Sequence, residues 1–113
     1  MNSQKKGKWN ENKLARQLSE VYPEAKRSYE ERSGNSGDLV NTGNYIFELK
    51  AGKRPSIYKA YSQACEASQA GETPVGVVKF DRSRRSDPRN GRKAFRGVML
   101  NLEDFIELLK QAE

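Results

Sequence analysis

Hydrophobic residues near the start of the chain recur at spacings of three and four, which is the period of a helix. The pattern predicts a helix from about residue 8 to residue 22, ended by Pro23, after a flexible basic tail over residues 1–7. An acid heads the otherwise apolar stripe, where a negative charge in the first helical turn is favourable. The stripe consists of Glu11, Leu14, Ala15, Leu18 and Val21.

Further along, the period changes to two, which is typical of strands. The segments "DLVN", "TGN" and "YIFELKA" predict a hairpin with a three-residue loop, in which Gly43 or Asn44 takes the left-handed position. That register places Asp38 directly opposite Glu48, with their Cβ atoms ~5 Å apart. A two-residue loop would shift the register by one and leave Asp38 diagonal to its partners. The other face of the hairpin would join the core through Leu39, Tyr45, Phe47 and Leu49.

The rest of the pattern completes one domain over residues 8–113, with the element order α-β-β-β-α-β-β-α. This order indicates an α/β (α+β) fold, in which helices pack on a single mixed sheet. The further elements expected are a polar exposed strand at 25–32, a helix at 56–70, a buried strand at 73–80, a charged loop at 81–93, a strand at 94–100 and a helix capped by Asn101.

The composition describes a basic chain without histidine. The 113 residues include 21 Lys and Arg against 15 Asp and Glu, and the net charge of +6 favours nucleic acid as the partner ahead of an anionic membrane surface. Without histidine, the chain cannot be a His-base nuclease, a Ser-His-Asp hydrolase or a protein with the usual His-based zinc site. Its chemistry must therefore use carboxylates, lysine, tyrosine or a hard metal ion.

The same sequence indicates a cytoplasmic protein. No apolar run approaches the ~20 residues of a membrane span, and the lysines near the N-terminus are not followed by the apolar stretch of a secretory signal. The single cysteine, Cys65, is expected in the core and fits a reducing compartment. Trp9 is expected to anchor the packing of the first helix.

The paired acids of the hairpin point to a divalent cation. Two carboxylates that face each other in a partly buried place cannot both ionise cheaply, and Mg²⁺ binds to one or two carboxylates together with water and substrate phosphate. Lys50 shares the strand face of Glu48, because side chains two positions apart point the same way. Lys50 can contact a scissile phosphate or the attacking water, so the group suits metal-assisted phosphodiester hydrolysis. The alternative is an exposed hairpin with a surface ion pair between Lys50 and one acid.

The Glu-x-Lys tripeptide carries little information by itself, since it occurs three times in this chain. The copy at 11–13 lies in a predicted helix, where positions i and i+2 diverge. The copy at 24–26 has no second acid placed to share a metal. Only the copy at 48–50 combines an apolar strand, an acid across the turn and a Gly-Asp doublet at the start of a strand.

The stretch "SGDLVNTGNYIFELK" resembles the motif of the PD-(D/E)XK nucleases: an acid that opens a strand, a hairpin, and then acid-x-lysine after aromatic and aliphatic residues. The order of elements is similar to the αβββαβ core of these restriction-endonuclease-like folds, here with an extra strand and a C-terminal helix. Over about residues 8–80 the chain is most similar to the compact Holliday-junction-resolvase-like branch and its phage relatives. It departs from the motif at Gly37, which replaces a proline that many members also lack.

The resemblance implies a role for each matching residue. Asp38, Glu48 and the backbone carbonyl of Leu49 would bind Mg²⁺, for which Mn²⁺ would substitute. Lys50 would orient the nucleophilic water and stabilise the phosphorane. Glu11, which matches a glutamate of the family's N-terminal helix, would assist the metal through water or bind a second ion. Gln63 matches a glutamine on the helix that follows the lysine, and Tyr58 on the same helix could also face the site.

A basic region near residue 80 is the second candidate surface. Arginine suits phosphate because its planar group donates two parallel hydrogen bonds, although a solvated loop has a similar composition. The residues expected to contact DNA here are Lys79, Arg82, Arg84, Arg85, Arg89, Arg92 and Lys93, with Arg96 at the end of the run. Lys53 and Arg54, together with Lys5, Lys6 and Lys8, could extend this surface.

The function expected from the sequence is a Mg²⁺-dependent DNA endonuclease of a bacterium or a phage-infected cell, structure-selective if it follows the resolvases it resembles. A homodimer would suit the two coordinated cuts of a junction, and a monomer would suit nicking. The alternatives are a nicking or sequence-guided nuclease of the same superfamily and a non-catalytic nucleic-acid-binding module. A ribosome-associated RNA-binding protein fits the charge but gives no reason for the group formed by Asp38, Glu48 and Lys50.

Overall fold

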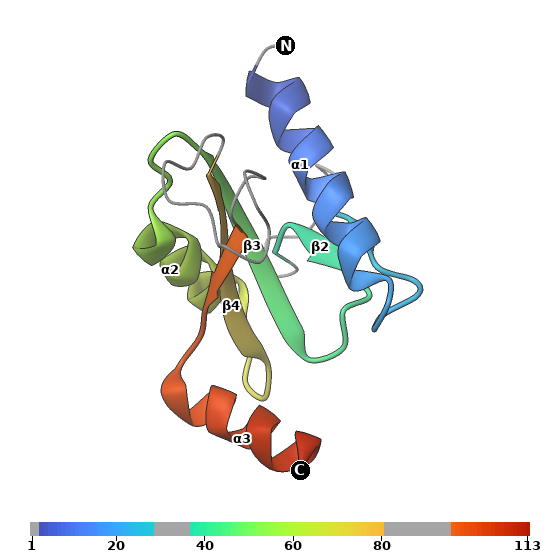
Figure 1. The fold of residues 1–113 in the computed structure, drawn as a ribbon, viewed down its shortest axis with the longest axis vertical. Coiled ribbons are helices and arrows are strands. Elements are labelled where there is room, and N and C mark those ends of the chain that lie inside the picture. Colours follow the sequence, from blue (N-terminus) through green and yellow to red (C-terminus); the bar gives the residue numbers. More distant parts are fainter. Residues whose placement is uncertain (1–2, 29–36, 81–95) are drawn as a thin grey trace.

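The computed structural model describes residues 3–28, 37–80 and 96–113. The mixed α/β fold and the order of its elements are as expected (Figure 1). The elements are α1 (Ser3–Leu18), β1 (Lys26–Arg27), β2 (Leu39–Val40), β3 (Tyr45–Gly52), α2 (Ile57–Ala67), β4 (Thr73–Phe80), β5 (Arg96–Met99) and α3 (Leu102–Ala112).

The strand β4 is the middle of a three-stranded mixed sheet. On one side it pairs in parallel with β3, beginning with Tyr45 opposite Thr73. On its other side it pairs antiparallel with β5, where Lys79 lies opposite Arg96. Parallel neighbours need a crossover connection, and α2 provides it between β3 and β4.

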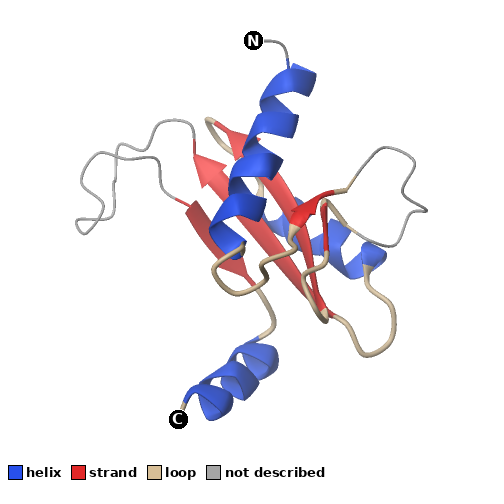
Figure 2. Ribbon diagram, turned by 90° about the vertical axis from the view of Figure 1, so that its right-hand side faces the viewer, coloured by secondary structure: helices blue, strands red, loops and turns tan. Residues whose placement is uncertain are grey.

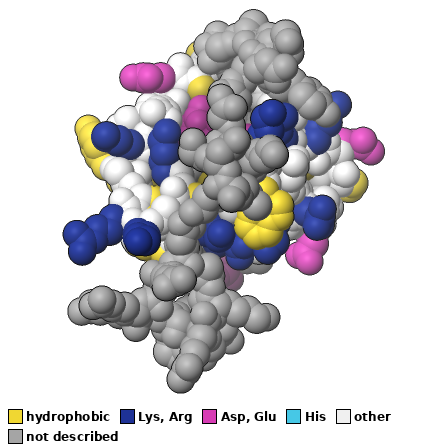
Figure 3. All heavy atoms as spheres, turned by 90° about the horizontal axis from the view of Figure 1, so that it is seen from above, with side chains coloured by type: hydrophobic (Ala, Val, Ile, Leu, Met, Phe, Trp, Pro, Cys, Tyr) yellow, Lys and Arg dark blue, Asp and Glu magenta, His cyan; other side chains and the backbone are white. Residues whose placement is uncertain are grey.

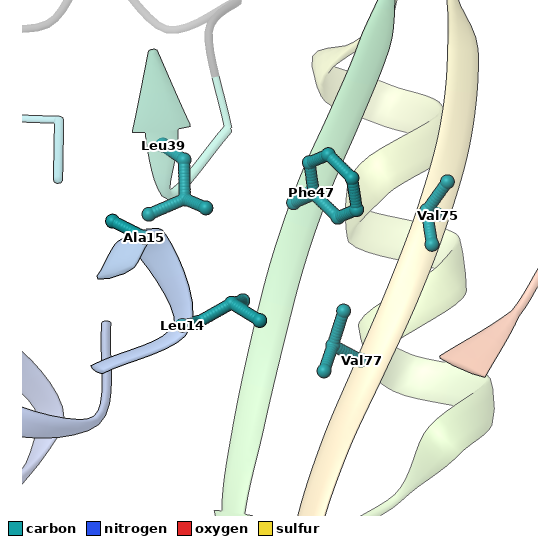
Figure 4. Close-up of a cluster of buried hydrophobic side chains, with 6 residues drawn as sticks. All are labelled: Leu14, Ala15, Leu39, Phe47, Val75 and Val77. Atoms are coloured by element: carbon teal, nitrogen blue, oxygen red, sulfur yellow. The ribbon is translucent and has the colours of Figure 1, made fainter. Parts of the chain in front are cut away.

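The sheet lies between α1 on one face and α2 on the other (Figure 2). On the α1 face, side chains of α1 and β2 point toward those of β3 and β4 and form the main core (Figure 4). This cluster consists of Leu14, Ala15, Leu39, Phe47, Val75 and Val77. On the opposite face, α2 buries Ala60, Ala64 and Ala67. Because alternate residues of a strand face opposite ways, Phe47 and Leu49 belong to the α1 face, whereas Glu48 and Lys50 belong to the α2 face.

The first helix is displaced toward the N-terminus relative to the expectation. It begins at Ser3, so the segment expected to be a flexible tail is helical from that residue on, and it ends at Leu18. The chain then turns, because the N–H groups of Val21 and Tyr22 both donate to the Leu18 carbonyl, at 2.9 and 2.7 Å. The turn moves Val21 off the apolar stripe, and its side chain is exposed.

The expected hairpin ladder between residues 38–41 and 45–51 is wrong. β2 pairs instead with β1, with Arg27 opposite Leu39, in a separate two-stranded sheet. Two residues in the left-handed region, Asn41 (φ 63°) and Gly43 (φ 61°), bend the chain between β2 and β3. Gly43 was an expected left-handed position, whereas Asn41 was not. The polar strand expected at 25–32 is reduced to β1 within the described residues, and its second half lies outside them.

The last helix stands apart from the rest. α3 lies beyond the end of the sheet in Figure 1, and none of its residues is buried. Within the described ranges, no helix has the length and apolar character needed to cross a membrane.

Candidate functional site

A pocket of about 410 Å³ opens beside β3, and it has the size of a typical ligand site. All five residues predicted to carry the chemistry border it, and so does Leu49. The lining residues are Glu11, Asp38, Glu48, Leu49, Lys50, Gln63, Glu66 and Ala67. They come from α1, from the residue before β2, from β3 and from α2, so the fold brings together positions that are far apart in the sequence.

Asp38 is buried, and both its backbone and its carboxylate form hydrogen bonds. It is 6% exposed, and its carboxylate Oδ2 accepts the Leu49 N–H at 2.7 Å. The Asp38 N–H donates to the Phe47 carbonyl at 2.8 Å, and the Asp38 carbonyl accepts the Ser28 N–H at 2.8 Å. Asp38 therefore contacts β3 on both sides of Glu48, even though the regular ladder between the two segments is absent.

The backbone conformation and close surroundings of residue 37 explain why a glycine precedes Asp38. Its φ of 71° is in the left-handed region, and a Cβ atom there would lie 2.7 Å from the Phe47 carbonyl oxygen and 2.9 Å from Ile46 Cγ2. Any larger residue would push the backbone away from β3. The close approach that fixes the Asp38 carboxylate thus depends on Gly37, which occupies the position of the proline in the motif that the chain resembles.

The strand β3 supplies the acid and the lysine of the predicted motif. Glu48 and Lys50 are both half-buried, lie on the same face of the strand and line the pocket. Leu49 points to the core on the other face, while its backbone N–H holds Asp38. Alternation along a strand therefore predicted correctly that Glu48 and Lys50 would lie on the same face of the strand.

Glu11 reaches the pocket from α1 and forms an ion pair that was not predicted from the sequence. Its Oε1 lies 3.8 Å from Nη1 of Arg27, and both side chains are largely buried, at 19% and 16% exposed. Arg27 also donates to the Ser28 carbonyl at 3.3 Å. An arginine fixed in this way orients the Glu11 carboxylate and balances part of its charge. The only sequence signal for Arg27 was the polar strand expected at 25–32.

From the other side, α2 contributes Gln63 and an acid that was not predicted. Glu66 follows Gln63 by three positions, which places both side chains on one face of a helix. Both are exposed and line the pocket. Counting positions three and four along from Gln63 would have found Glu66. Tyr58 is not among the lining residues, and its side chain is 70% exposed.

The donors around this pocket suit a hard cation. They are carboxylates and one amide, which are the oxygen ligands that Mg²⁺ takes, and four acids surround one lysine in a chain that is basic overall. Nevertheless, no three Asp, Glu, Cys or His side chains within residues 3–28, 37–80 and 96–113 come close enough together to hold an ion by themselves. Asp38 and Glu48 would therefore share an ion with water and a substrate phosphate, as is usual for Mg²⁺.

The remaining predicted residues fall in several places. Lys53 and Arg54 are exposed just past the end of β3, whereas Lys79 lies on β4 and contacts α1. Figure 3 shows several Lys and Arg side chains spread over the face seen from above, with Asp and Glu side chains among them. Part of the expected DNA surface lies outside the described residues, namely Arg82, Arg84, Arg85, Arg89, Arg92 and Lys93.

Two residues expected inside the protein are at its surface. Cys65, expected in the core, is exposed, because the buried stripe of α2 runs through its alanines. Trp9, expected to anchor α1, is 44% exposed. The face of α1 that packs on the sheet instead carries Leu14 and Ala15.

Comparisons of the chain with family models, with curated proteins and with solved structures find no match.

Proposed function

We propose that this protein is a Mg²⁺-dependent DNA endonuclease that hydrolyses phosphodiester bonds at the pocket beside β3. The observation that carries the proposal is the convergence of Glu11, Asp38, Glu48, Lys50 and Gln63 on one pocket. These residues were selected from the sequence for their chemistry and for their resemblance to PD-(D/E)XK nucleases. The net charge of +6 favours a polyanionic substrate.

In this proposal each side chain has a distinct task. Asp38 and Glu48 would hold the ion, and the Leu49 N–H holds the Asp38 carboxylate in place. Such an ion would supply a Lewis acid for the phosphate and would make a water more acidic. Lys50 lies beside Glu48, where its ammonium orients the attacking water and neutralises charge that develops on the phosphate oxygens. The water oxygen forms a bond to phosphorus as the bond to the leaving sugar oxygen breaks; the water loses a proton to solvent and the leaving oxygen gains one.

Glu11 and Gln63 support this arrangement from the flanking helices. Glu11, oriented by Arg27, would hold a water of the ion, and the Gln63 amide can hydrogen-bond to a phosphate oxygen or to the attacking water. Both act at one remove from the metal, so their loss should slow cleavage less than the loss of Asp38.

A non-catalytic DNA-binding module is the second candidate. It is favoured by the absence, within the described residues, of three acidic side chains that converge on one point. Such a module would keep the pocket and its charge but would not need a metal ion to work.

The test is cleavage of linear, nicked and four-way-junction DNA with Mg²⁺, with Mn²⁺ and with excess chelator. Cleavage should require the metal, and Asp38→Asn and Glu48→Gln should each reduce it by at least about 100-fold. Asp38→Asn keeps an oxygen that can accept the Leu49 N–H, so the fold should be retained. Lys50→Ala should lose most cleavage but keep metal affinity in calorimetry, because lysine is not a ligand.

The matched control is Glu20→Gln, an exposed acid on the turn after α1 that undergoes the same change of charge. It should cleave like the wild type. Full activity in chelator would refute the metal site. Metal-independent DNA binding without cleavage of any substrate would instead identify the non-catalytic module. The substrate that is cut fastest decides between a junction-selective enzyme and a nicking or sequence-guided one.

A further inference from the structure

A second group of residues, away from the pocket, combines an exposed aromatic ring with cations. Trp9 is 44% exposed on α1, and the ammonium groups of Lys13 and Lys79 lie 4.4 and 5.1 Å from the centroid of its ring. Lys13 follows Trp9 by four positions, so the two side chains lie on the same face of the helix. Trp9 is the only tryptophan in the chain.

The sheet adds a third cation to this group. Lys79 lies directly opposite Arg96 in the antiparallel pair of β4 and β5, so both side chains leave the same face of the sheet. Like charges in directly opposed positions disfavour folding, and an anion bound between them would reverse that effect. The position of Lys79 is fixed, because its Nζ donates at 3.1 Å to Oδ1 of Asn10, which is 4% exposed.

Together, these features fit a strand of nucleic acid better than a duplex. An exposed indole can stack on a base, and neighbouring cations can bind the flanking phosphates. Inside a duplex both faces of every base are already stacked, so only an unpaired or extruded base can reach the ring. A contact between an exposed lysine and an aromatic ring is weak. A base can therefore displace the Lys13 ammonium, which remains near enough to bind the phosphate.

We propose that Trp9, Lys13, Lys79 and Arg96 form a platform that binds single-stranded DNA, with an unpaired base stacked on the Trp9 ring and its phosphates on the three cations. DNA as the partner rests on the proposed function, whereas binding to the platform does not require cleavage. Lys79 and Arg96 leave the α1 face of the sheet, while Glu48 and Lys50 leave the α2 face. α1 carries residues of both sites, Trp9 and Glu11. The substrate of this protein would accordingly have an unpaired segment in addition to the bond that is cut.

The test uses the fluorescence of Trp9 in excess chelator, where the proposed nuclease is inactive. Three probes of about 12 nucleotides are compared: oligothymidylate, the same strand with abasic central positions, and a blunt duplex. Oligothymidylate should quench the Trp9 emission strongly, and the abasic strand and the duplex should quench it little. Equal quenching by the duplex or by the abasic strand would overturn stacking of a base.

The contribution of each side chain to binding is measured with single-residue variants, from the fluorescence anisotropy of a labelled oligothymidylate. Trp9→Ala should weaken binding by roughly 5- to 100-fold, and Trp9→Phe by less, because a smaller ring still stacks. Lys13→Ala and Arg96→Ala should each reduce the dependence of log affinity on log salt by about 0.7. Lys59→Ala, which removes an exposed lysine on α2, is the matched control and should change neither quantity.

The outcomes separate this proposal from the proposed nuclease. The platform would be refuted if the Trp9→Ala variant has the urea midpoint of the wild type and also binds oligothymidylate with wild-type affinity. This conclusion would hold whatever the cleavage assays give. Quenching that persists in Asp38→Asn supports the platform, even if no DNA is ever cut. Tighter binding of oligouridylate than of oligothymidylate would assign the platform to RNA and overturn the choice of DNA.

Discussion

The helices α2 and α3 are alike in length and capping, yet only α2 is docked on the sheet. Each has 11 residues and a side-chain N-cap: the Ser56 hydroxyl accepts the Lys59 N–H, and Asn101 Oδ1 accepts the Glu103 N–H. α2 buries three alanines. α3 carries the larger apolar stripe and buries none of it. The stripe residues and their exposed fractions are Leu102 69%, Phe105 44%, Ile106 40% and Leu109 47%.

The difference shows that docking depends on shape as well as on apolar area. The alanines of α2 let its backbone approach β4 so closely that Gly76 has no room for a side chain. A stripe of large side chains, such as that of α3, would need a groove to fill, whereas α2 covers a sheet face that carries Gly76. Local sequence signals predicted both helices, but such signals do not say whether a helix will find a surface to cover.

Breaking the close contact of α2 should have the largest effect. In Gly76→Ala the new Cβ would lie 2.5 Å from the Tyr61 nitrogen and 3.0 Å from the Ala60 carbonyl carbon, and both are backbone atoms that cannot rotate away. We expect a loss of about 1–3 kcal/mol in the free energy of unfolding, measured with urea. Under the proposed function, the displaced helix should also reduce cleavage, because it carries Gln63 and Glu66.

Gly7→Ala is the control for this substitution. Gly7 lies in α1, and an added Cβ would meet nothing within 4 Å. Alanine is the better helix former, so this variant should be as stable as the wild type or more stable by up to ~1 kcal/mol. Equal losses in both variants would contradict the account of α2 packing.

Removing the N-cap side chain of α2 or of α3 should have the next largest effect on stability. Each cap contributes about 1 kcal/mol to its own helix. Ser56→Ala should lower the urea midpoint of the whole domain, because unfolding α2 uncovers the sheet. Asn101→Ala should speed hydrogen exchange of the amides of α3 and leave that midpoint nearly unchanged. If Asn101→Ala shifts the midpoint as far as Ser56→Ala does, α3 is part of the cooperative unit and the contrast between the helices fails.

The smallest expected effect is on the titration of Tyr61 in α2, which tests how near α3 lies to α2. Partial burial and a hydrogen bond with Cys65 raise the pKa of the Tyr61 hydroxyl above its ordinary value of 10.0, and the Asp104 carboxylate of α3 adds a further upward contribution. The folded protein therefore keeps this proton at a pH where the unfolded chain loses it. The resulting stability is present below pH 10 and declines as the pH rises through the folded-state pKa.

Asp104→Asn should accordingly move the pKa of Tyr61 part of the way back toward its ordinary value. The measurement is the absorbance of tyrosinate against pH, with Tyr61→Phe to identify which transition belongs to this residue. Glu103→Gln, which alters an exposed acid on the neighbouring position of α3, is the control. An Asp104→Asn titration identical to the wild type would show that α3 does not keep Asp104 near Tyr61.

Local patterns in the sequence predicted much of the fold. The strand at 73–80 has the expected bounds, and α2 lies within the predicted 56–70. Alternation placed Glu48 and Lys50 on one face and Phe47 in the core. These features depend on neighbours a few positions away, and such neighbours are visible in a sequence.

Several of the errors concern contacts between segments. β2 pairs with β1 rather than with β3, and the left-handed Asn41 bends the chain between β2 and β3. Arg27 becomes part of the site only because β1 is held beside α1. Trp9 lies outside the core because Leu14 and Ala15 face the sheet instead.

The parallel pairing of β3 and β4 determines when this chain can fold during its synthesis. Among the residues that the structure describes, every ladder partner of β3 lies in β4, from Tyr45 opposite Thr73 to Gly52 opposite Phe80. α2 alone is too short to be stable in water, since isolated helices below ~12–15 residues are marginal. While Phe80 is still inside the ribosome, β3 therefore has no partner strand, and Phe47 on it is exposed. Until β4 emerges, the unpaired edge of β3 and its apolar side chains favour aggregation.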